Sequence, residues 1–490
     1  MLLLGSLLVM PAAAQTGGSA PATDGGRSLP LNWRIGIEQL KLPDGEQIGL
    51  VGASALVGVG NGWFAGPIVF GAASGQRGGL FVIGGEALWR TAGPAGSRIE
   101  AGLAIGGGGG AAAPVGSGLM LRPHLDWSWP VGPGWLGITA SRVDFPRGAI
   151  ASNQIGLVYS VDDIFRYQRA GSARSAGSGQ RSGFGFDRFW LLAGQYRSKS
   201  GNHGYGGLRA DHLLGNGFHV GIEAAGAAQG GADGYAEILG SIGKEWSLKT
   251  GPGPSALPAV GIRAAAGLGG GGAVDTGGGP LLKLAATLHW DLPHDLALGV
   301  EAGRTMAPDG SFRANHLHLA LGLNLDRRAA GGRAAAAPAD LRADTVEWAA
   351  TLGHFPQMDY RNGSSDAVQT VGMRLSRRLS PALDEHLQLT GGIHFAAGGR
   401  AGAYGAGLIG LALATPLQQQ GLHLGAEMLA GAAGGGGIDT RGGAVVQPML
   451  RAGWADGSQR WRIGVGQIRS LRGDLRSPVV ELSYGAAIGL

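Results

Sequence analysis

The stretch LMLRPHLDWSW, residues 119–129, decides the fold class of this chain. Its apolar side chains occupy every second position, while Arg122, His124 and Asp126 lie between them. Because successive side chains of a β-strand point to opposite faces, this order produces one apolar and one polar face. Alternation over about ten residues is typical of a tilted strand that crosses a membrane, whereas other strands usually have about five or six residues.

The same pattern returns twice further along the chain. Residues 282–292 and 317–325 alternate in the same way, and runs of glycine begin at Gly106, Gly269 and Gly434. The three runs start 163 and 165 residues apart, and Trp127, Trp290 and Trp454 keep nearly the same spacing. Self-similarity at a fixed period is the signature of an internal repeat. We therefore predict three repeats of about eight strands each.

The repeats divide the chain into seven segments. Residues 1–14 form an apolar run that ends in a small-residue cleavage site, which predicts a signal peptide. The other segments are a flexible tail at 15–28, β-repeats at 29–165, 184–326 and 344–490, and linkers at 166–183 and 327–343. In the first repeat we expect strands to begin near Trp33, Ile48, Trp63, Leu80, Ile99, Leu119, Trp135 and Asn153.

The C-terminus keeps the alternation to its last residue. Apolar residues stand at every second position from Pro478 to Leu490. This segment resembles the terminal strand of Gram-negative outer-membrane β-barrel proteins, although the usual final residue there is aromatic. The resemblance is one of class, not of a specific family. It implies the outer membrane of a Gram-negative bacterium as the location, with lipid, lipopolysaccharide and the barrel assembly machinery as partners.

The composition excludes several other classes. The chain has 490 residues, of which 97 are Gly and none is Cys, so disulfides and thiolate metal sites are impossible. Its net charge is +5 and its Arg residues are scattered, which predicts no nucleic-acid partner. The glycine runs lack the Lys of a phosphate-binding loop, and we predict no cofactor and no metal. A soluble glycine-rich β-protein is the alternative to a membrane barrel.

Charged and histidine residues recur on the polar face of the predicted strands. The inner wall of a membrane barrel carries such residues, so we expect them to face the lumen. The candidates are Arg122, His124, Asp126, Lys283, His289, Asp291, Glu301, His316, His318 and Arg451. Because no Ser is placed beside His316 and His318, we predict no catalytic residues.

Trp and Arg residues on the apolar face mark the two membrane interfaces. Trp combines an apolar ring with a polar N–H, and an outward Arg can extend to lipid phosphates. If strand five of each repeat runs outward, Trp127, Trp290 and Trp454 lie at the periplasmic interface. Arg142, Arg304 and Arg469 then lie at the outer one, beside lipopolysaccharide, and the glycine runs lie at the cell surface.

The size of the barrel decides the expected function. Many inward positions are small, for example Gly102, Ala104, Gly299 and Gly303, and a small barrel needs larger groups to fill its core. This favours a single barrel of about 24 strands over three eight-stranded barrels. We accordingly expect a wide conduit, an export pore for a polymer or protein cargo, or a sheath around a partner crossing the membrane.

Two other functions stay open. Three small barrels could display glycine-rich surface loops and act as a structural or binding protein. An outer-membrane lipid-modifying enzyme would require a hydroxyl nucleophile near His316 and His318.

Overall fold

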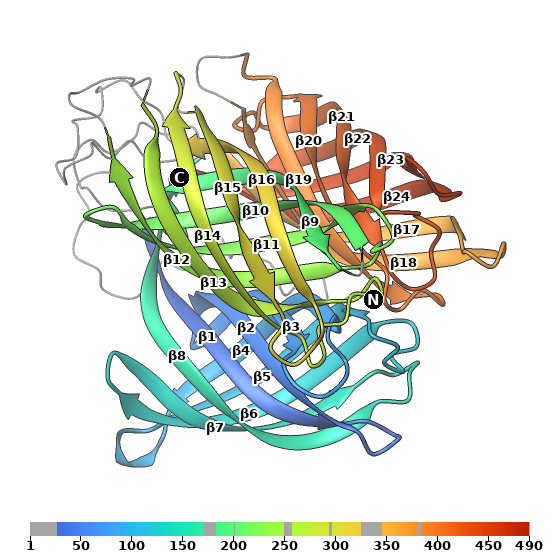
Figure 1. Cartoon of the computed structure of the whole chain (residues 1–490). Helices are drawn as coiled ribbons and strands as arrows, with labels where there is room; N and C mark the ends of the chain where they lie inside the picture. Colours follow the sequence, from blue (N-terminus) through green and yellow to red (C-terminus); the bar gives the residue numbers. More distant parts are fainter. Residues whose placement is uncertain are drawn as a thin grey trace.

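The computed structural model is an all-β, antiparallel arrangement of 24 strands (Figure 1). It describes residues 27–170, 183–199, 201–248, 257–293, 296–324, 345–379 and 384–489. The predicted signal peptide and the linker at 327–343 lie outside these residues. Within the described ranges, no helix is long and apolar enough to cross a membrane.

The first eight strands form one closed barrel. Strand β1 pairs with β8 through twelve residue pairs, from Arg27↔Tyr167 to Glu38↔Gly156. Seven of the eight predicted starts lie within two residues of the observed ones, and β1 begins six residues before Trp33. The elements are β1 (Arg27–Lys41), β2 (Gln47–Gly60), β3 (Trp63–Ala72), β4 (Phe81–Ala92), the 3-10 turn η1 (Pro94–Gly96), β5 (Arg98–Gly109), β6 (Leu119–Val131), β7 (Gly134–Asp144) and β8 (Ala151–Arg169).

The next eight strands form the second barrel. Strand β16 pairs with β9 from Ala314↔Ser198 to Asn324↔Arg188, which closes the ring. The strands are β9 (Arg188–Ser198), β10 (Gly201–Gly215), β11 (Phe218–Gln229), β12 (Ala236–Ser247), β13 (Ala259–Gly270), β14 (Pro280–Asp291), β15 (Leu296–Met306) and β16 (Arg313–Asn324).

The last eight strands form the third barrel. Strand β17 pairs with β24 from Thr345↔Gly489 to His354↔Val480. The strands are β17 (Thr345–Asp359), β18 (Ser365–Arg378), β19 (Leu387–Gly398), β20 (Gly405–Ala414), β21 (Gly421–Gly434), β22 (Ala444–Asp456), β23 (Gln459–Ser470) and β24 (Arg476–Gly489).

The prediction of a single barrel of about 24 strands is therefore wrong. Figure 1 shows three separate barrels, in blue to cyan, green to yellow and orange to red. The first and third barrels share a short pairing, Ile488↔Arg169 and Gly489↔Gln168, which joins them into one 16-stranded sheet. Each of the two still closes on itself through its own first and last strands.

Small inward residues do not enlarge the barrels, because large side chains from neighbouring strands lie over them. The ring of His124 covers Gly102, and the ring of Trp190 covers both Gly299 and Gly322. The glycines make room for these rings inside a narrow barrel. Small inward positions therefore do not indicate a wide lumen, because they accommodate large side chains of neighbouring strands.

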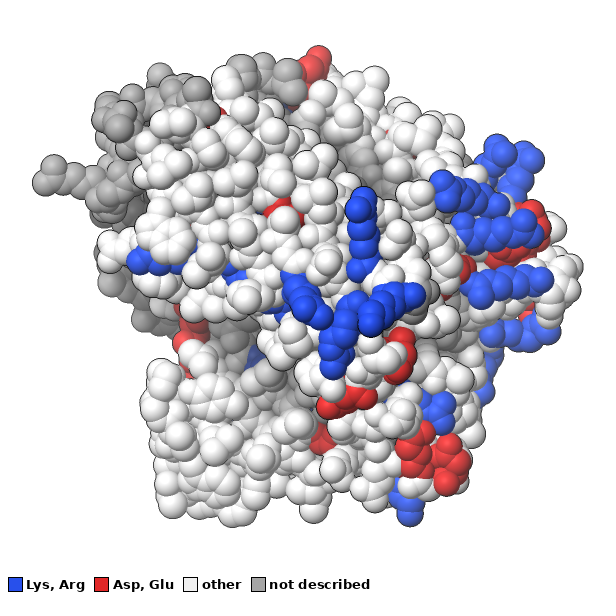
Figure 2. Space-filling view, in the orientation of Figure 1, with Lys and Arg blue, Asp and Glu red and all other residues white. Residues whose placement is uncertain are grey.

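The outer faces of the barrels are apolar, as the alternation predicts. On β16, Leu317, Leu319 and Leu321 are 56, 59 and 50% exposed, whereas His316 and His318 between them are buried. Figure 2 shows a mostly uncharged surface, with basic side chains gathered in its centre and on the third barrel. Exposed rows of leucine on a closed barrel match a lipid-facing surface.

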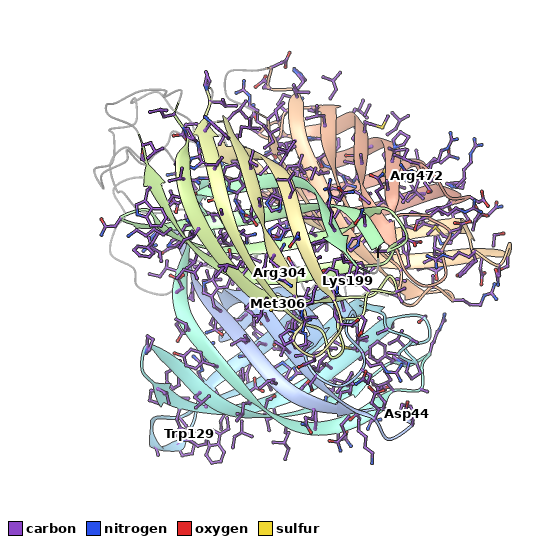
Figure 3. The ribbon with its side chains drawn as sticks, viewed as in Figure 1. Asp44, Trp129, Lys199, Arg304, Met306 and Arg472 are labelled. Carbon is purple, nitrogen blue, oxygen red and sulfur yellow. The ribbon has the colours of Figure 1, made fainter. Side chains whose placement is uncertain are left out.

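Tryptophan residues occupy only one end of the barrels. Each of the twelve lies in the first half of an odd-numbered strand or the second half of an even-numbered strand. Antiparallel order places all these half-strands at the same end of their barrel. Figure 3 labels one of them, Trp129, at the end of the first barrel far from Asp44. Apart from Trp190, which is buried inside the second barrel, these side chains form a one-sided aromatic belt that matches one membrane–water interface.

Candidate functional site

The interior of the first barrel is crossed by an ion-pair cluster centred on Arg34 of β1. Its guanidinium contacts Glu100 of β5 and Asp126 of β6 and lies 3.9 Å from Glu86 of β4. The four side chains are at most 6% exposed. Since β1 faces β4, β5 and β6 across the barrel, Arg34 spans the interior.

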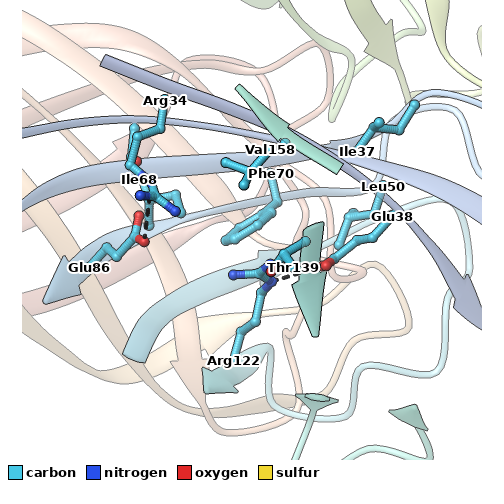
Figure 4. Close-up of a pocket in the computed structure, with 13 residues that line it drawn as sticks. Arg34, Ile37, Glu38, Leu50, Ile68, Phe70, Glu86, Arg122, Thr139 and Val158 are labelled. Atoms are coloured by element: carbon cyan, nitrogen blue, oxygen red, sulfur yellow. Dashed lines mark hydrogen bonds and ion pairs between the residues drawn. The ribbon is translucent and has the colours of Figure 1, made fainter. Parts of the chain in front are cut away.

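A second bridge of the first barrel joins Arg122 of β6 to Glu38 of β1. The Arg122 Nε and Nη2 atoms donate to the two Glu38 oxygens at 2.8 and 2.9 Å. Figure 4 shows Arg34 and Glu86 on one side of a small pocket and Arg122 and Glu38 on the other, with Phe70 between them. The His124 Nε2 atom lies 2.9 Å from Glu86, and its Nδ1 atom lies 3.1 Å from Asp126.

The second barrel is crossed by two linked bridges. Glu301 of β15 binds Arg263 of β13 and accepts a hydrogen bond of 3.0 Å from Arg209 of β10. Lys283 of β14 donates to Glu223 and Glu237 at 2.6 and 2.9 Å. Arg263 also lies 2.8 Å from Glu223, so the two bridges form one network.

The third barrel repeats this chemistry with different strands. Arg374 of β18 contacts Glu427 of β21 at 3.0 Å and Glu481 of β24 at 3.2 Å. Arg451 of β22 contacts the same two carboxylates, with an Nε–Oε1 distance of 2.8 Å to Glu427. A small pocket adjoins this cluster, lined among others by Arg374, Glu427 and Arg451.

These clusters occlude all three barrels. A buried charge is costly unless it is paired and hydrogen-bonded, and each network joins opposite walls with charge-assisted bonds. The clusters thereby fill eight-stranded interiors that are just wide enough for side chains. The described strands consequently enclose narrow, separate cavities in place of a wide aqueous lumen.

The predicted lumen residues lie inside the barrels, with two at an end. His289 and Asp291 are half-buried where β14 ends, and His289 lies 3.4 Å from Glu245. The other eight are buried: Arg122, His124, Asp126, Lys283, Glu301, His316, His318 and Arg451. The sequence prediction missed their partners, among them Arg34, Glu38, Glu100, Arg263, Glu427 and Glu481. These partners also stand at alternate, inward positions of their strands, and this period of two is the sequence signal that identifies them.

The histidine pair of the second barrel has hydroxyl neighbours that the sequence did not reveal. The Nδ1 atom of His316 lies 3.1 Å from the Thr305 hydroxyl, and that of His318 lies 2.7 Å from the Tyr205 hydroxyl. Both Nε2 atoms lie 3.4 Å from Glu301. All five side chains are buried in the network, an arrangement that braces the barrel and gives a lipid substrate no access.

The predicted interface residues lie on the outer faces. Arg142, Arg304 and Arg469 are exposed near the ends of β7, β15 and β23. Trp127 and Trp454 are 47 and 59% exposed, and Trp290 is half-buried. The Trp and Arg residues thus occupy opposite ends of the barrels.

Strand five of each barrel lies against strand three of another barrel. Strand β5 contacts β19, β21 contacts β11 and β13 contacts β3. Because each barrel uses the same two strands, the contacts form a head-to-tail ring that closes after three members. We call these contacts the glycine junction, since Gly107, Gly109, Gly270, Gly271 and Gly434 lie at their centre.

The glycine junction brings backbones together at distances that exclude side chains. A Cβ atom at Gly107 would lie 2.8 Å from the Ala396 carbonyl oxygen of the third barrel. A Cβ atom at Gly79 would meet the backbone of Gly271 in the second barrel. Glycine is required here because no other residue permits such close approach.

Each of the three interfaces also has a hydrogen bond between barrels. An ion pair between Arg361 of the third barrel and Asp233 of the second supports one of them. The bonds run from Gly78 N to Gly277 O at 2.8 Å, from Ser117 Oγ to Ala397 O at 3.3 Å and from Thr440 Oγ1 to Asp233 Oδ2 at 3.2 Å.

The structure corrects the expectation that the glycine runs form displayed loops. Gly107, Gly270 and Gly434 are buried in the glycine junction. Thr276 and Thr440, which follow the second and third runs, are 1 and 0% exposed. These segments connect barrels and are not free to bind an outside partner.

Comparisons with known proteins find a distant likeness between this chain and solved structures. No family model and no curated protein matches the chain. The ferric enterobactin receptor PfeA of Pseudomonas aeruginosa is 9% identical, with 95% of this chain and 82% of that chain covered and a TM-score of 0.28. OccK11 (OpdR) of P. aeruginosa is 11% identical, with 95% of this chain and 98% of that chain covered and a TM-score of 0.21. The FrpB iron transporter of Neisseria meningitidis is 10% identical, with 94% of this chain and 81% of that chain covered and a TM-score of 0.27.

These neighbours are Gram-negative outer-membrane proteins and include receptors and a transporter. The closed antiparallel barrels confirm the predicted all-β fold, and the outer-membrane location stays a prediction. Because every TM-score here lies below 0.5, the likeness carries no argument for the activity or ligand of any one neighbour.

Proposed function

We propose that this chain is an outer-membrane scaffold of three occluded barrels, held in one body by the glycine junction, with a structural and binding role. The observation that carries the proposal is the buried ion-pair network across each barrel, centred on Arg34, Glu301 and Arg451. A pore for a polymer or protein would need an open lumen at this point. The apolar outer faces and the Trp belt support a position within the membrane.

Planar-bilayer recording tests the occlusion directly. Full-length protein, inserted into a lipid bilayer, should give no current steps of the size that an open 16-stranded porin gives. Proteoliposomes should not swell in iso-osmotic sugar solutions. Regular porin-sized steps, or swelling in a disaccharide, would overturn the scaffold proposal.

A narrow ion path is the second candidate function, and the small pockets beside the charged clusters of the first and third barrels favour it. Each pocket adjoins charged side chains, so a change in pairing could connect it to solvent. In this alternative, the variant Arg34→Ala should raise small-ion conductance through the first barrel, while Arg304→Ala on the outer face should not. Equal currents from both variants and the wild type would eliminate the ion path.

A further inference from the structure

A row of polar side chains crosses three strands on the outer face of the second barrel. Asn315 of β16 pairs in register with Arg197 of β9 on one side and Arg304 of β15 on the other. All three residues are exposed. Side chains directly opposite each other on antiparallel strands have Cβ atoms about 5 Å apart. The two guanidinium groups and the amide can therefore converge on one small anion.

The row is electropositive and lacks an internal counter-ion. Lys199 is exposed just past the end of β9, and Figure 3 labels it close to Arg304. Figure 2 shows basic side chains at this place. Among the described residues, no carboxylate forms an ion pair with Arg197, Lys199 or Arg304. The side-chain partner of Arg197 is the neutral Gln195, 3.3 Å away. A bound anion would thus meet unneutralised positive charge.

The surface next to the row identifies the kind of anion. Along β16 from Asn315, the same face continues with Leu317, Leu319 and Leu321, all at least half exposed. On β15 it continues with Ala302 and Leu298. A basic row at one edge of an apolar wall matches a lipid, whose phosphate and acyl chains are joined in one molecule. A soluble phosphate compound has no acyl chains that could cover the apolar wall.

We propose that Arg197, Arg304 and Asn315, with Lys199 at the rim, bind the phosphate of a membrane lipid headgroup. Arginine suits this role because its planar guanidinium gives two parallel hydrogen bonds to a phosphate. The inference rests on the proposed membrane position and adds a specific lipid site to it. The row lies at the end of the barrel opposite the Trp belt, so it faces the headgroups of the other leaflet.

The other barrels carry related but weaker versions of the row. In the first barrel, Arg142 of β7 donates a hydrogen bond of 3.2 Å to Asn153 of β8. The exposed Lys41 of β1 lies next to β8, where its backbone N–H donates to the hydroxyl of Ser152. In the third barrel, Arg469 and Arg476 are in register. Among the strands that the structure describes, only those of the second barrel combine two arginines with an amide between them, which is why we assign the site there.

Lipid binding by the purified full-length protein tests the assignment. The probe is lipid A with two phosphates, titrated into detergent-solubilised protein and followed by native mass spectrometry. Dephosphorylated lipid A and inorganic phosphate are the comparison ligands. The variant R197Q/K199Q/R304Q removes the cations of the row. The control R27Q/R169Q/K244Q removes three cations from the Trp end of the barrels.

We expect the row variant to bind lipid A about 100-fold more weakly, taking a factor of about five for each cation removed. The control should bind like the wild type, and dephosphorylated lipid A should bind the wild type weakly. Equal affinities of the row variant and the wild type would overturn the site. Displacement of lipid A by an equal concentration of inorganic phosphate would also overturn it, since the apolar wall would then contribute nothing.

A separate readout distinguishes failure of the site from failure of the scaffold proposal. Both variants should float with liposomes and keep the heat-dependent gel migration of a folded barrel. Loss of lipid A binding with flotation retained supports the site. A wild-type protein that does not float would instead contradict the membrane position on which the site depends.

Discussion

A methyl group placed at Gly107 should loosen the glycine junction while leaving every barrel folded. Gly107 lies in β5, where it faces β19 of the third barrel. Its Cβ atom would lie 2.8 Å from the Ala396 oxygen, 2.9 Å from the Phe395 oxygen and 2.9 Å from Val371 Cγ2. The φ angle of Gly107 is not in the left-handed region, so alanine adds no backbone strain of its own.

The size of the effect follows from these distances. Ordinary contacts of a Cβ atom begin near 3.4 Å, so the facing backbone must withdraw by about 0.5 Å. Overpacking of this kind costs about 1–3 kcal/mol. That corresponds to a shift of about 5- to 150-fold toward an arrangement in which the first and third barrels have separated. Gly107→Val should have a larger effect.

The assay uses the absence of cysteine from the chain. Nitroxide labels at Ala112→Cys and Arg400→Cys, both in exposed loops of the two barrels, report the distance between them by double electron–electron resonance. We expect one narrow distribution in the parent and a broader, longer one with Gly107→Ala.

The matched control is Gly407→Ala in β20, whose Cβ atom would meet only Ile393 Cγ2 at 3.7 Å. It should leave the distribution unchanged. If Gly107→Val kept the narrow distribution of the parent, the reasoning about close backbone approach would be refuted.

Three further predictions concern the interior, the outer face and a junction loop. Arg263→Met should destabilise the second barrel by about 3–5 kcal/mol, because it takes one of two cationic partners from each of the buried carboxylates Glu223 and Glu301; urea unfolding followed by Trp fluorescence measures this, and a change below about 1 kcal/mol would contradict the network. Leu319→Arg should cost about 2–4 kcal/mol in lipid vesicles, as expected for a cation at the membrane midplane. Gln419→Arg, in the exposed turn between β20 and β21, should be nearly neutral, and equal costs for the two variants would argue against a lipid-facing β16. Hydrogen bonds from Ser311, followed in size by one from Gly277, hold the pKa of Asp275 below its usual value. The carboxylate therefore stabilises this loop at pH values above the pKa that Asp275 has in the unfolded chain. That contribution should disappear as the pH falls through the folded pKa, and hydrogen exchange at the loop should lose this pH dependence in Asp275→Asn.

The sequence by itself determined the strands and their faces. Alternation is a local property with a period of two, so residues 119–129 reveal which side chains point outward without knowledge of any partner strand. For the same reason, Leu125 and Trp127 were assigned to the exposed face and Arg122 and Asp126 to the buried one, and the structure agrees.

Only the tertiary structure decided how many strands close each ring and where the glycine runs lie. Closure depends on the pairing of β1 with β8, of β9 with β16 and of β17 with β24, and alternation is identical in a barrel of any size. Gly102 could line a wide lumen or lie beneath His124, and only the long-range register distinguishes the two. The burial of Gly107 against Ala396 likewise joins residues almost three hundred positions apart, a contact that no local pattern encodes.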